Sequence, residues 1–340
     1  IKMDIQSAIS QVSARRNLTR EDMSEIILEI LEGKVTDAQI GAFLIALSMK
    51  GETVDEVLGA VGVMRDLSTK VEIDEPNLID TCGTGGTGIG IFNVSTTSAL
   101  VASSCGAKIA KHGNRSATRK SGSADLLEQA GVSLSLTPEQ VASCIQEIGL
   151  GFMFAQAHHS AMRHVVGPRK EIGQKSIFNV LGPLTNPASA KRQVLGVYDK
   201  KWMTPIAEVL DELGSEHLLI VHSRDGLDEI SLASPTYVTE MRDGKISEYE
   251  VSPEDFNFET DTLEGLQVNS PHESLDLAKL ALQGEHKKAS SMICMTAGAA
   301  LYVSDIANSL ESGVELAKRS VENGEGLKKL NQLVEFTSQF

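Results

Sequence analysis

Hydrophobic and polar positions follow a helical period over residues 3–70. Each of three segments opens with a threonine that is followed three residues later by an acidic or amide side chain: Thr19-x-x-Asp22, Thr36-x-x-Gln39 and Thr53-x-x-Glu56. In such a capping box the two side chains accept hydrogen bonds from each other's backbone N–H groups and so start a helix. Gly33 and Gly51 stand where helices should stop. The pattern predicts a compact set of short antiparallel helices.

The pattern changes at residue 77, where short apolar runs begin to alternate with helical stretches. Such runs are typical of buried, mostly parallel strands, and they cover residues 78–80, 108–110, 151–155, 194–198 and 217–221. Residues 237–241 and 246–251 flank Asp243-Gly244, which favours a two-residue hairpin. From residue 272 the pattern is helical again, and the small residues at 296–300 would let helices pack closely.

The predicted fold class is therefore α/β: a large domain with a mostly parallel central sheet flanked by helices, plus a small all-helical N-terminal domain. We place the helical domain at residues 1–73 and the α/β domain at residues 74–340. Residues 160–187 look helical and polar, and they interrupt the alternation of predicted strands and helices. We expect this segment to join the N-terminal helices, which would make their domain discontinuous.

Composition narrows the choice of location and partners. The hydrophobic fraction of 41% is enough for a packed core, yet no apolar run approaches the ~18 residues of a membrane span. The four scattered cysteines form no C-x-x-C pair, which is typical of free thiols in a reducing cytoplasm. We expect a cytoplasmic protein without a membrane partner.

The charge is acidic overall and basic in the middle. A formal net charge of −15 argues against nucleic acid as a partner. Residues 103–192 nevertheless hold 11 Lys/Arg against 5 Asp/Glu, so this segment is +6 and the remainder is −21. A basic centre in an acidic chain suits a small anionic ligand, although a solvated basic face would give the same count.

The motif richest in information is the glycine turn at residues 83–88, Gly-Thr-Gly-Gly-Thr-Gly, which lies between a predicted strand and a predicted helix over 93–105. Glycines allow positive φ and can expose successive N–H groups to an anion. Alone, the string also fits an ordinary turn, and it has neither the closing Lys of a P-loop nor the distal acidic residue of a dinucleotide fingerprint. The basic, hydroxyl and amide residues at 111–123 favour a ligand that carries several phosphates.

Several strings occur in the order of a known family: GTGG, NVST, KHGNR, KSGSAD, HHSAMRHVVGPRKEIG, FNVLGPLTNP and DGLDE. In this combination the chain resembles the anthranilate phosphoribosyltransferases over essentially its whole length. The resemblance implies an enzyme that joins the amine of anthranilate to C1 of 5-phosphoribosyl 1-diphosphate (PRPP) and releases pyrophosphate, the second step of tryptophan biosynthesis from chorismate. It also implies a homodimer formed through the helical domain, and it leaves open whether an anthranilate synthase partner with glutamine amidotransferase activity associates.

The implied reaction sets the chemistry that the site must supply. An arylamine is neutral near pH 7 and carries a free lone pair, so no strong base is needed, and the difficult step is departure of pyrophosphate from an oxocarbenium-like ribose. Positioning and stabilisation of the leaving group's charge should carry the catalysis. We therefore predict no residue that acts as acid or base.

The resemblance assigns residues to PRPP and to a Mg²⁺ cofactor. The PRPP residues are Gly83, Gly85, Gly86, Thr87, Asn93, Ser95, Thr96, Lys111 and Ser123, and the Mg²⁺ residues are Ser95, Asp228 and Glu229. From the residues alone, simpler roles stay open. Asn93 could be only a helix cap, Lys111 an exposed lysine, and residues 228–229 a solvated turn.

The residues assigned to anthranilate by the resemblance are Gly83, His112, Asn114, His159, Arg169 and Pro183. The planar guanidinium of Arg169 suits a carboxylate. His158 is a neighbour whose register stays open, and a lone histidine is often structural.

The chain departs from the family pattern at two places. Thr87 stands where the family usually has aspartate, and Lys175-Ser176 stand where it usually has Arg-Thr. The first change bears on the handling of pyrophosphate and metal. We expect the second to concern an interface or packing.

Two other functions fit the sequence less well. A pyrimidine nucleoside phosphorylase shares the implied fold, but KHGNR and FNVLGPLTNP fit the transferase better, and the Asp228-Glu229 pair would have no obvious task. An inactive relative that binds single-stranded DNA in the same cleft is disfavoured by the net charge of −15.

Overall fold

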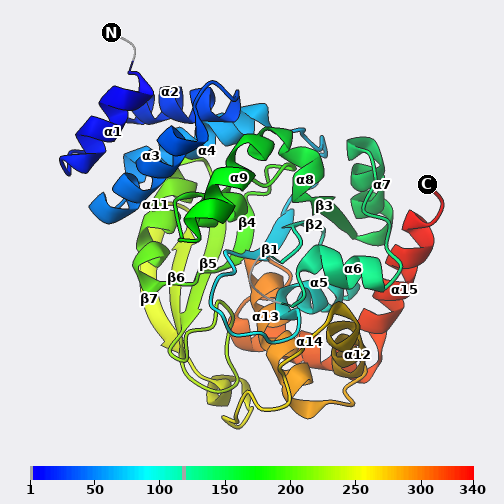
Figure 1. Ribbon diagram of the computed structural model, residues 1–340. Helices are drawn as coiled ribbons and strands as arrows, with labels where there is room; N and C mark the ends of the chain where they lie inside the picture. The colour runs from blue at the N-terminus through cyan, green and yellow to red at the C-terminus, as the bar shows by residue number, and fades with distance from the viewer. Residues whose placement is uncertain (1–2, 117–119) are drawn as a thin grey trace.

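Among the residues that the structure describes, 3–116 and 120–340, a seven-stranded sheet of order β3-β2-β1-β4-β5-β6-β7 runs through the middle of the molecule (Figure 1). The structure is a computed structural model. Strands β1 to β5 run parallel, whereas β6 and β7 are antiparallel to their neighbours. The strands are β1 (Ile79–Gly83), β2 (Ile109–Gly113), β3 (Leu150–Phe154), β4 (Arg192–Gly196), β5 (His217–Ser223), β6 (Thr236–Arg242) and β7 (Lys245–Val251).

Every strand predicted from the sequence is present, with its ends shifted. The run predicted at 194–198 is observed as Arg192–Gly196. It ends early because the Tyr198 N–H donates to the Thr84 hydroxyl (2.9 Å) and not to a neighbouring strand. The hairpin predicted at Asp243-Gly244 is confirmed, and these residues have the positive φ (50° and 74°) that a type I′ turn requires.

The N-terminal helices are α1 (Ile5–Ser13), α2 (Arg20–Leu31), α3 (Asp37–Lys50) and α4 (Val54–Leu67). The predicted capping boxes are confirmed at the starts of α2, α3 and α4. Gly51, with a φ of 90°, ends α3 as expected. The helical prediction for this part of the chain is therefore confirmed.

The other helices surround the sheet. They are α5 (Val94–Ser104), α6 (Ser123–Gln129), α7 (Pro138–Ile148), α8 (Ala155–His158), α9 (Arg163–Ile172), α10 (Phe178–Leu181), α11 (Met203–Glu212), α12 (Pro271–Leu282), α13 (Lys287–Val303), α14 (Leu310–Glu322) and α15 (Glu325–Thr337). Short 3₁₀ helices cover Ser160–Met162, Gly182–Leu184, Lys200–Trp202 and Pro253–Phe256. Of the helices in the described part of the chain, none has the length and apolarity to cross a bilayer.

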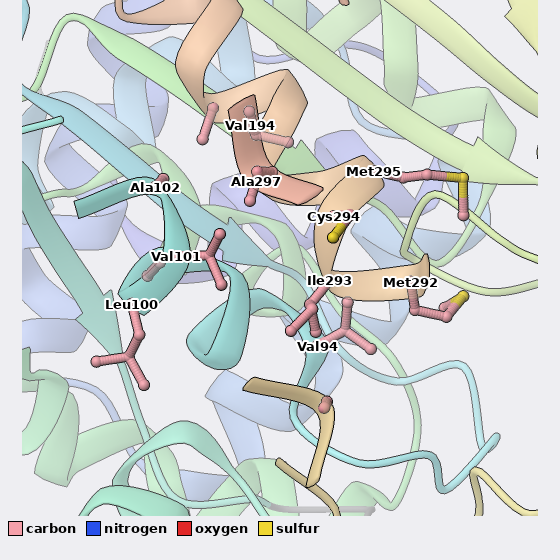
Figure 2. Close-up of a cluster of buried hydrophobic side chains, with 14 of the residues drawn as sticks. Val94, Leu100, Val101, Ala102, Val194, Met292, Ile293, Cys294, Met295 and Ala297 are labelled. Carbon is pink, nitrogen blue, oxygen red and sulfur yellow. The ribbon is translucent and has the colours of Figure 1, made fainter. Parts of the chain in front are cut away.

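The sheet separates two hydrophobic cores. Alternate residues of a strand point to opposite faces. Val194 of β4 therefore lies in a cluster with α5 and α13, and Leu195 lies in a cluster with α1–α4 and α11. Figure 2 shows the first core, where side chains of α5 such as Val101 face side chains of α13 such as Cys294. Figure 1 shows α1–α4 at the top of the view and α12–α14 at the bottom, with the sheet between them.

Residues 160–187 are helical, as expected, but they are not polar throughout. Val165, Ile177 and Phe178 are buried in the cluster that holds α1–α4. The same cluster includes Leu195 and Ile220 from the sheet, so the N-terminal helices share their core with one sheet face. The division into domains at residue 73 stays a prediction.

Helices α13 and α14 cross in close contact, as the small residues at 296–300 predicted. A Cβ on Gly298 would lie 2.5 Å from the backbone nitrogen of Val314, and one on Gly313 would lie 2.3 Å from the carbonyl oxygen of Gly298. No side chain fits between the two backbones. The C-terminal layer therefore depends on this glycine pair.

Gly298→Ala should lower the free energy of unfolding by about 1–3 kcal/mol, because the added methyl overpacks the crossing. Gly62→Ala in α4 is the matched control, since a Cβ there would meet nothing within 4 Å. It should be neutral or stabilise by about 0.5–1 kcal/mol. Urea unfolding followed by circular dichroism measures both changes, and equal stability of the two variants would contradict the argument.

Candidate functional site

The candidate residues gather at the carboxyl edge of the parallel strands. From β1 the chain runs to β2 through α5, which covers one face of the sheet, and from β4 it runs to β5 through α11, which covers the other. The crevice between β1 and β4 is therefore a topological switch point, the usual ligand site of an open α/β sheet. The glycine turn follows β1 and lies at this point.

The Asp228 carboxylate lies under the glycine turn. Its Oδ2 accepts the N–H of Gly85 (3.0 Å), where φ is +63°. A Cβ on Gly83 would lie 3.0 Å from the same oxygen, and a Cβ on Gly196 would lie 1.8 Å from the Asp228 carbonyl oxygen. Asp228 and Glu229 are only 4% and 9% exposed, so they do not form a solvated turn. The Gly85 N–H is thus occupied by Asp228, and the binding of an anion at the other N–H groups of the turn stays a prediction.

The ends of β1 and β4 are tied together beside this turn. The Thr84 N–H donates to the Gly196 carbonyl (2.9 Å), and the Thr84 hydroxyl accepts the Tyr198 N–H. The Thr87 hydroxyl accepts the Ile89 N–H at 3.4 Å, so it supports the turn itself. Thr84 and Tyr198 were missed from the sequence, because their contact joins residues 114 apart.

Asn93 is the N-cap residue of α5, but its side chain makes no capping hydrogen bond. Its side-chain oxygen accepts from the hydroxyls of Ser121 (2.7 Å) and Ser274 (2.8 Å), and its amide donates to the Ser121 carbonyl. The side chain of Asn93 therefore does not occupy the N-terminal N–H groups of α5. Thr96, in the first turn, has a buried hydroxyl without a partner among the described residues.

Lys111 is buried, which excludes the exposed lysine that the sequence left open. It is 1% exposed on β2, and its ammonium donates to the Thr81 carbonyl and lies 3.5 Å from the Ser95 hydroxyl. Burial lowers the pKa of Lys111, and the nearby charges of Asp80, Cys82 and Glu229 act against this shift. The positive charge therefore lies directly beneath the start of α5.

Asp80 is a site residue that sequence reasoning missed. Its fully buried carboxylate accepts the backbone N–H of His112 (3.1 Å) and the Asn186 amide (2.8 Å). Burial raises the pKa of Asp80, and the charge of Lys111 opposes the rise. The signal was present in the sequence as a charged residue inside a predicted buried strand.

His112, near the end of β2, and His159, directly after α8, have their rings close together. Their ring centroids are 5.1 Å apart, and both Nε2 atoms are buried without a partner among the described residues. Burial lowers the pKa of His112 well below its usual range and that of His159 to about 4, so both rings are neutral. His158 instead pairs with the Thr69 carbonyl (2.8 Å), which favours the register that places His159 at the site.

The remaining predicted residues come from other elements. Pro183 follows Gly182, whose backbone lies beside the His112 ring. The Arg169 guanidinium lies 5.8 Å from the centroid of the Phe178 ring, and burial lowers its pKa. No contact between described residues joins Arg169 or the exposed Asn114 to the histidine pair. Ser123 is near Asn114, whose carbonyl it contacts at 3.4 Å.

The predicted metal ligands offer only oxygen donors. Asp228, Glu229 and the hydroxyl of Ser95 lie around the glycine turn and Lys111. Within the described ranges no group of three or more His, Cys, Asp or Glu side chains could hold a metal. Mg²⁺ typically takes one or two carboxylates and completes its shell with water and substrate phosphates. The donor set fits that ion.

Lys175, at the second departure from the family pattern, lies beside the glycine turn, and its expected role at an interface or in packing stays a prediction. Its Cε lies 3.5 Å from where a Cβ of Gly86 would be, and its ammonium lies 3.8 Å from the centroid of the Tyr198 ring. Gly86 precedes Thr87. The two departures from the family pattern therefore both lie next to Gly86.

The sequence matches of the two parts of the chain define its class as a glycosyl transferase family. Residues 75–327 match the family described as "Glycosyl transferase family, a/b domain", and residues 6–68 match the "Glycosyl transferase family, helical bundle domain".

Comparison with individual proteins narrows the class. The chain is 53% identical to the anthranilate phosphoribosyltransferase of Ectopseudomonas mendocina, over 99% of this chain and 98% of that protein. The enzyme of Thermus thermophilus superimposes with a TM-score of 0.91 at 38% identity, covering 97% of this chain and 99% of that one. The Saccharomyces cerevisiae enzyme, solved in complex with PRPP and Mg, gives a TM-score of 0.90 at 26% identity over 99% and 98%. This chain belongs to the anthranilate phosphoribosyltransferase family.

Because His112 and His159 are buried as neutral rings, the free energy of unfolding should depend on pH. The pKa of His159 is about 4 in the folded chain, against about 6.5 when unfolded, so between these values the unfolded chain binds more protons. Stability should therefore be retained above about pH 6.5 and fall as the pH drops towards 4. In His159→Asn this slope should be smaller, as measured by urea unfolding at a series of pH values. An unchanged slope would show that His159 is not buried as a neutral ring.

Proposed function

We propose that this protein transfers the 5-phosphoribosyl group of PRPP to the amine of anthranilate and releases pyrophosphate, the second step of tryptophan biosynthesis from chorismate. The observation that carries the proposal is the convergence of the glycine turn, Lys111 and the Asp228-Glu229 pair at one switch point. Family membership over nearly the whole chain supports the same reaction.

PRPP lies on the glycine turn, with its phosphates at the exposed N–H groups and at the N-terminus of α5. Ser95 and Thr96 supply hydroxyls there, and Lys111 supplies a positive charge from below. These fixed dipoles and charges stabilise the negative charge that grows on pyrophosphate as the bond to C1 breaks. Asn93 and Ser123 hold the neighbouring loop in place.

Mg²⁺ is part of the proposal, held by Ser95, Asp228 and Glu229, and it supplies a cation that neutralises the leaving pyrophosphate. The relative that was solved with PRPP and Mg supports this assignment. The Gly85 N–H and the metal require the same Asp228 carboxylate, so this side chain links the turn to the cation.

Anthranilate lies near His112, His159 and Pro183, with its carboxylate at Arg169. The two rings are neutral, so they do not compete with Arg169 for the carboxylate, and their Nε2 atoms are available to orient the amine. The amine nitrogen forms the new bond to C1 while the bond from C1 to the pyrophosphate oxygen breaks. Since the amine already carries its lone pair, no residue has to act as a base.

The direct test is the loss of anthranilate fluorescence when the purified protein is mixed with PRPP and Mg²⁺. Stoichiometric release of pyrophosphate should accompany it. Phosphorolysis of a pyrimidine nucleoside without this reaction would overturn the proposal.

The proposal includes a homodimer formed through the helical domain. Met49 on α3 and Val166 on α9 are 72% and 58% exposed, and these two helices pack against each other. Large apolar side chains on adjacent helices favour a partner surface. Analytical ultracentrifugation of the wild type and of Val166→Glu would show a dimer and its dissociation.

Arg169→Ala should raise KM for anthranilate by about 10- to 100-fold, the usual effect of losing a hydrogen bond to a charged group, with a much smaller change for PRPP. The exposed Arg163, on the same helix, provides the matched control Arg163→Ala. Steady-state kinetics measures both. If the two variants have the same KM for anthranilate, Arg169 does not bind its carboxylate.

Asp228→Asn combined with Glu229→Gln should abolish turnover at every Mg²⁺ concentration while the fold persists. The fold should survive because the amide oxygen of an asparagine at this position can still accept the Gly85 N–H. Activity across a Mg²⁺ titration, with circular dichroism as the folding check, measures this. Wild-type rates at any Mg²⁺ level would remove the pair from the mechanism.

A further inference from the structure

Lys175 is a cation on the open side of the glycine turn. It lies in the segment between α9 and α10, and its side chain is exposed. No carboxylate of the described residues pairs with it. Instead, its ammonium lies 3.8 Å from the centroid of the Tyr198 ring and 3.8 Å from the Cβ position of Gly86. A positive charge without a counter-ion is thus held directly beside the turn.

Tyr198, whose ring contacts the Lys175 ammonium, is held by hydrogen bonds at its backbone and at its side-chain hydroxyl. The Tyr198 N–H donates to the Thr84 hydroxyl (2.9 Å), which belongs to the glycine turn. The Tyr198 hydroxyl accepts the indole N–H of Trp202 (3.1 Å), and Trp202 is buried. Because Tyr198 is tied to the turn, a Lys175 ammonium that rests on its ring lies beside Gly86.

The contact between Lys175 and Tyr198 is the weaker of two contacts open to this ammonium. An exposed cation–π contact stabilises less than a charge-assisted hydrogen bond to a phosphate oxygen. Among the described residues, the Gly86 N–H has no acceptor. A phosphate that accepted this N–H would lie within reach of the flexible Lys175 side chain, which would then leave the ring.

We infer that Lys175 is a further binding residue for the pyrophosphate group of PRPP, held ready on the Tyr198 ring beside Gly86. This inference rests on the proposed placement of PRPP on the glycine turn. It adds a contact from the segment that follows α9, the helix that carries Arg169. PRPP and anthranilate would then be bound by residues at and just beyond the end of one helix.

Three variants test the role of Lys175. Lys175→Met keeps the length of the side chain and removes the charge, and Lys175→Arg keeps the charge. The matched control is Lys200→Met, because Lys200 is also exposed and its ammonium lies 3.5 Å from the centroid of another tyrosine ring, that of Tyr237. Calorimetry measures the dissociation constants of PRPP and of inorganic pyrophosphate, and kinetics separates KM from kcat.

Lys175→Met should weaken both ligands about tenfold, with little change in kcat or in KM for anthranilate. Lys175→Arg should restore binding, and Lys200→Met should bind as the wild type does. Trp202 is the single tryptophan, so its emission should change when PRPP displaces Lys175 from Tyr198, and this change should be lost in Lys175→Met. Unchanged dissociation constants in Lys175→Met, or an equal loss in Lys200→Met, would overturn the inference.

Ser95→Ala separates this inference from the proposal on which it rests. If Ser95→Ala weakens PRPP and Lys175→Met does not, PRPP lies at the start of α5 and only the role of Lys175 is wrong. If neither variant weakens PRPP, its placement on the glycine turn is wrong as well.

Discussion

The geometry of the site depends on the fit of Asp228 between the ends of β1 and β4. Its carboxylate accepts the Gly85 N–H, and its backbone leaves no room for a side chain at Gly196. β1 and β4 are paired along their length, and Asp228 fills the space where both strands end. The glycine turn that follows β1 is thereby tied to the Asp228 segment, which lies 143 residues further along the chain. A larger residue at 196 would displace the carboxylate as well as the strand.

A second constraint is the electrostatic cost of burying a charged side chain. Lys111 is almost fully buried beneath α5, and burial of an uncompensated charge is costly. The Thr81 carbonyl and the nearby carboxylates of Asp80 and Glu229 offset this cost. Asp80 in turn accepts the His112 backbone N–H, so the buried charge of Lys111 and the position of His112 share one buried support.

The sequence predicted what short-range patterns determine. The capping boxes, the seven strands of the described chain and the Asp243-Gly244 hairpin follow from local spacing, and each is confirmed. The sequence strings shared with the family pointed to the glycine turn, to Lys111 and to the Asp228-Glu229 pair. The structure places these three features close together. The role of Asn93 and the position of Lys175 were not predictable, because their partners Ser274 and Gly86 are far away in sequence. The individual ligand assignments stay predictions until variants are measured.

The contact between Gly85 and Asp228 also bears on how the chain is made. The two residues are 143 positions apart, so this hydrogen bond has to close a long loop. At roughly 5–20 residues per second of translation, the glycine turn waits about 10 to 30 seconds after its synthesis for the carboxylate that fixes it. Helices α1–α4, whose caps are all local, have no such delay. The nascent chain therefore carries a finished helical segment long before it carries a catalytic site, and a ribosome that stalls before residue 228 releases a product without one.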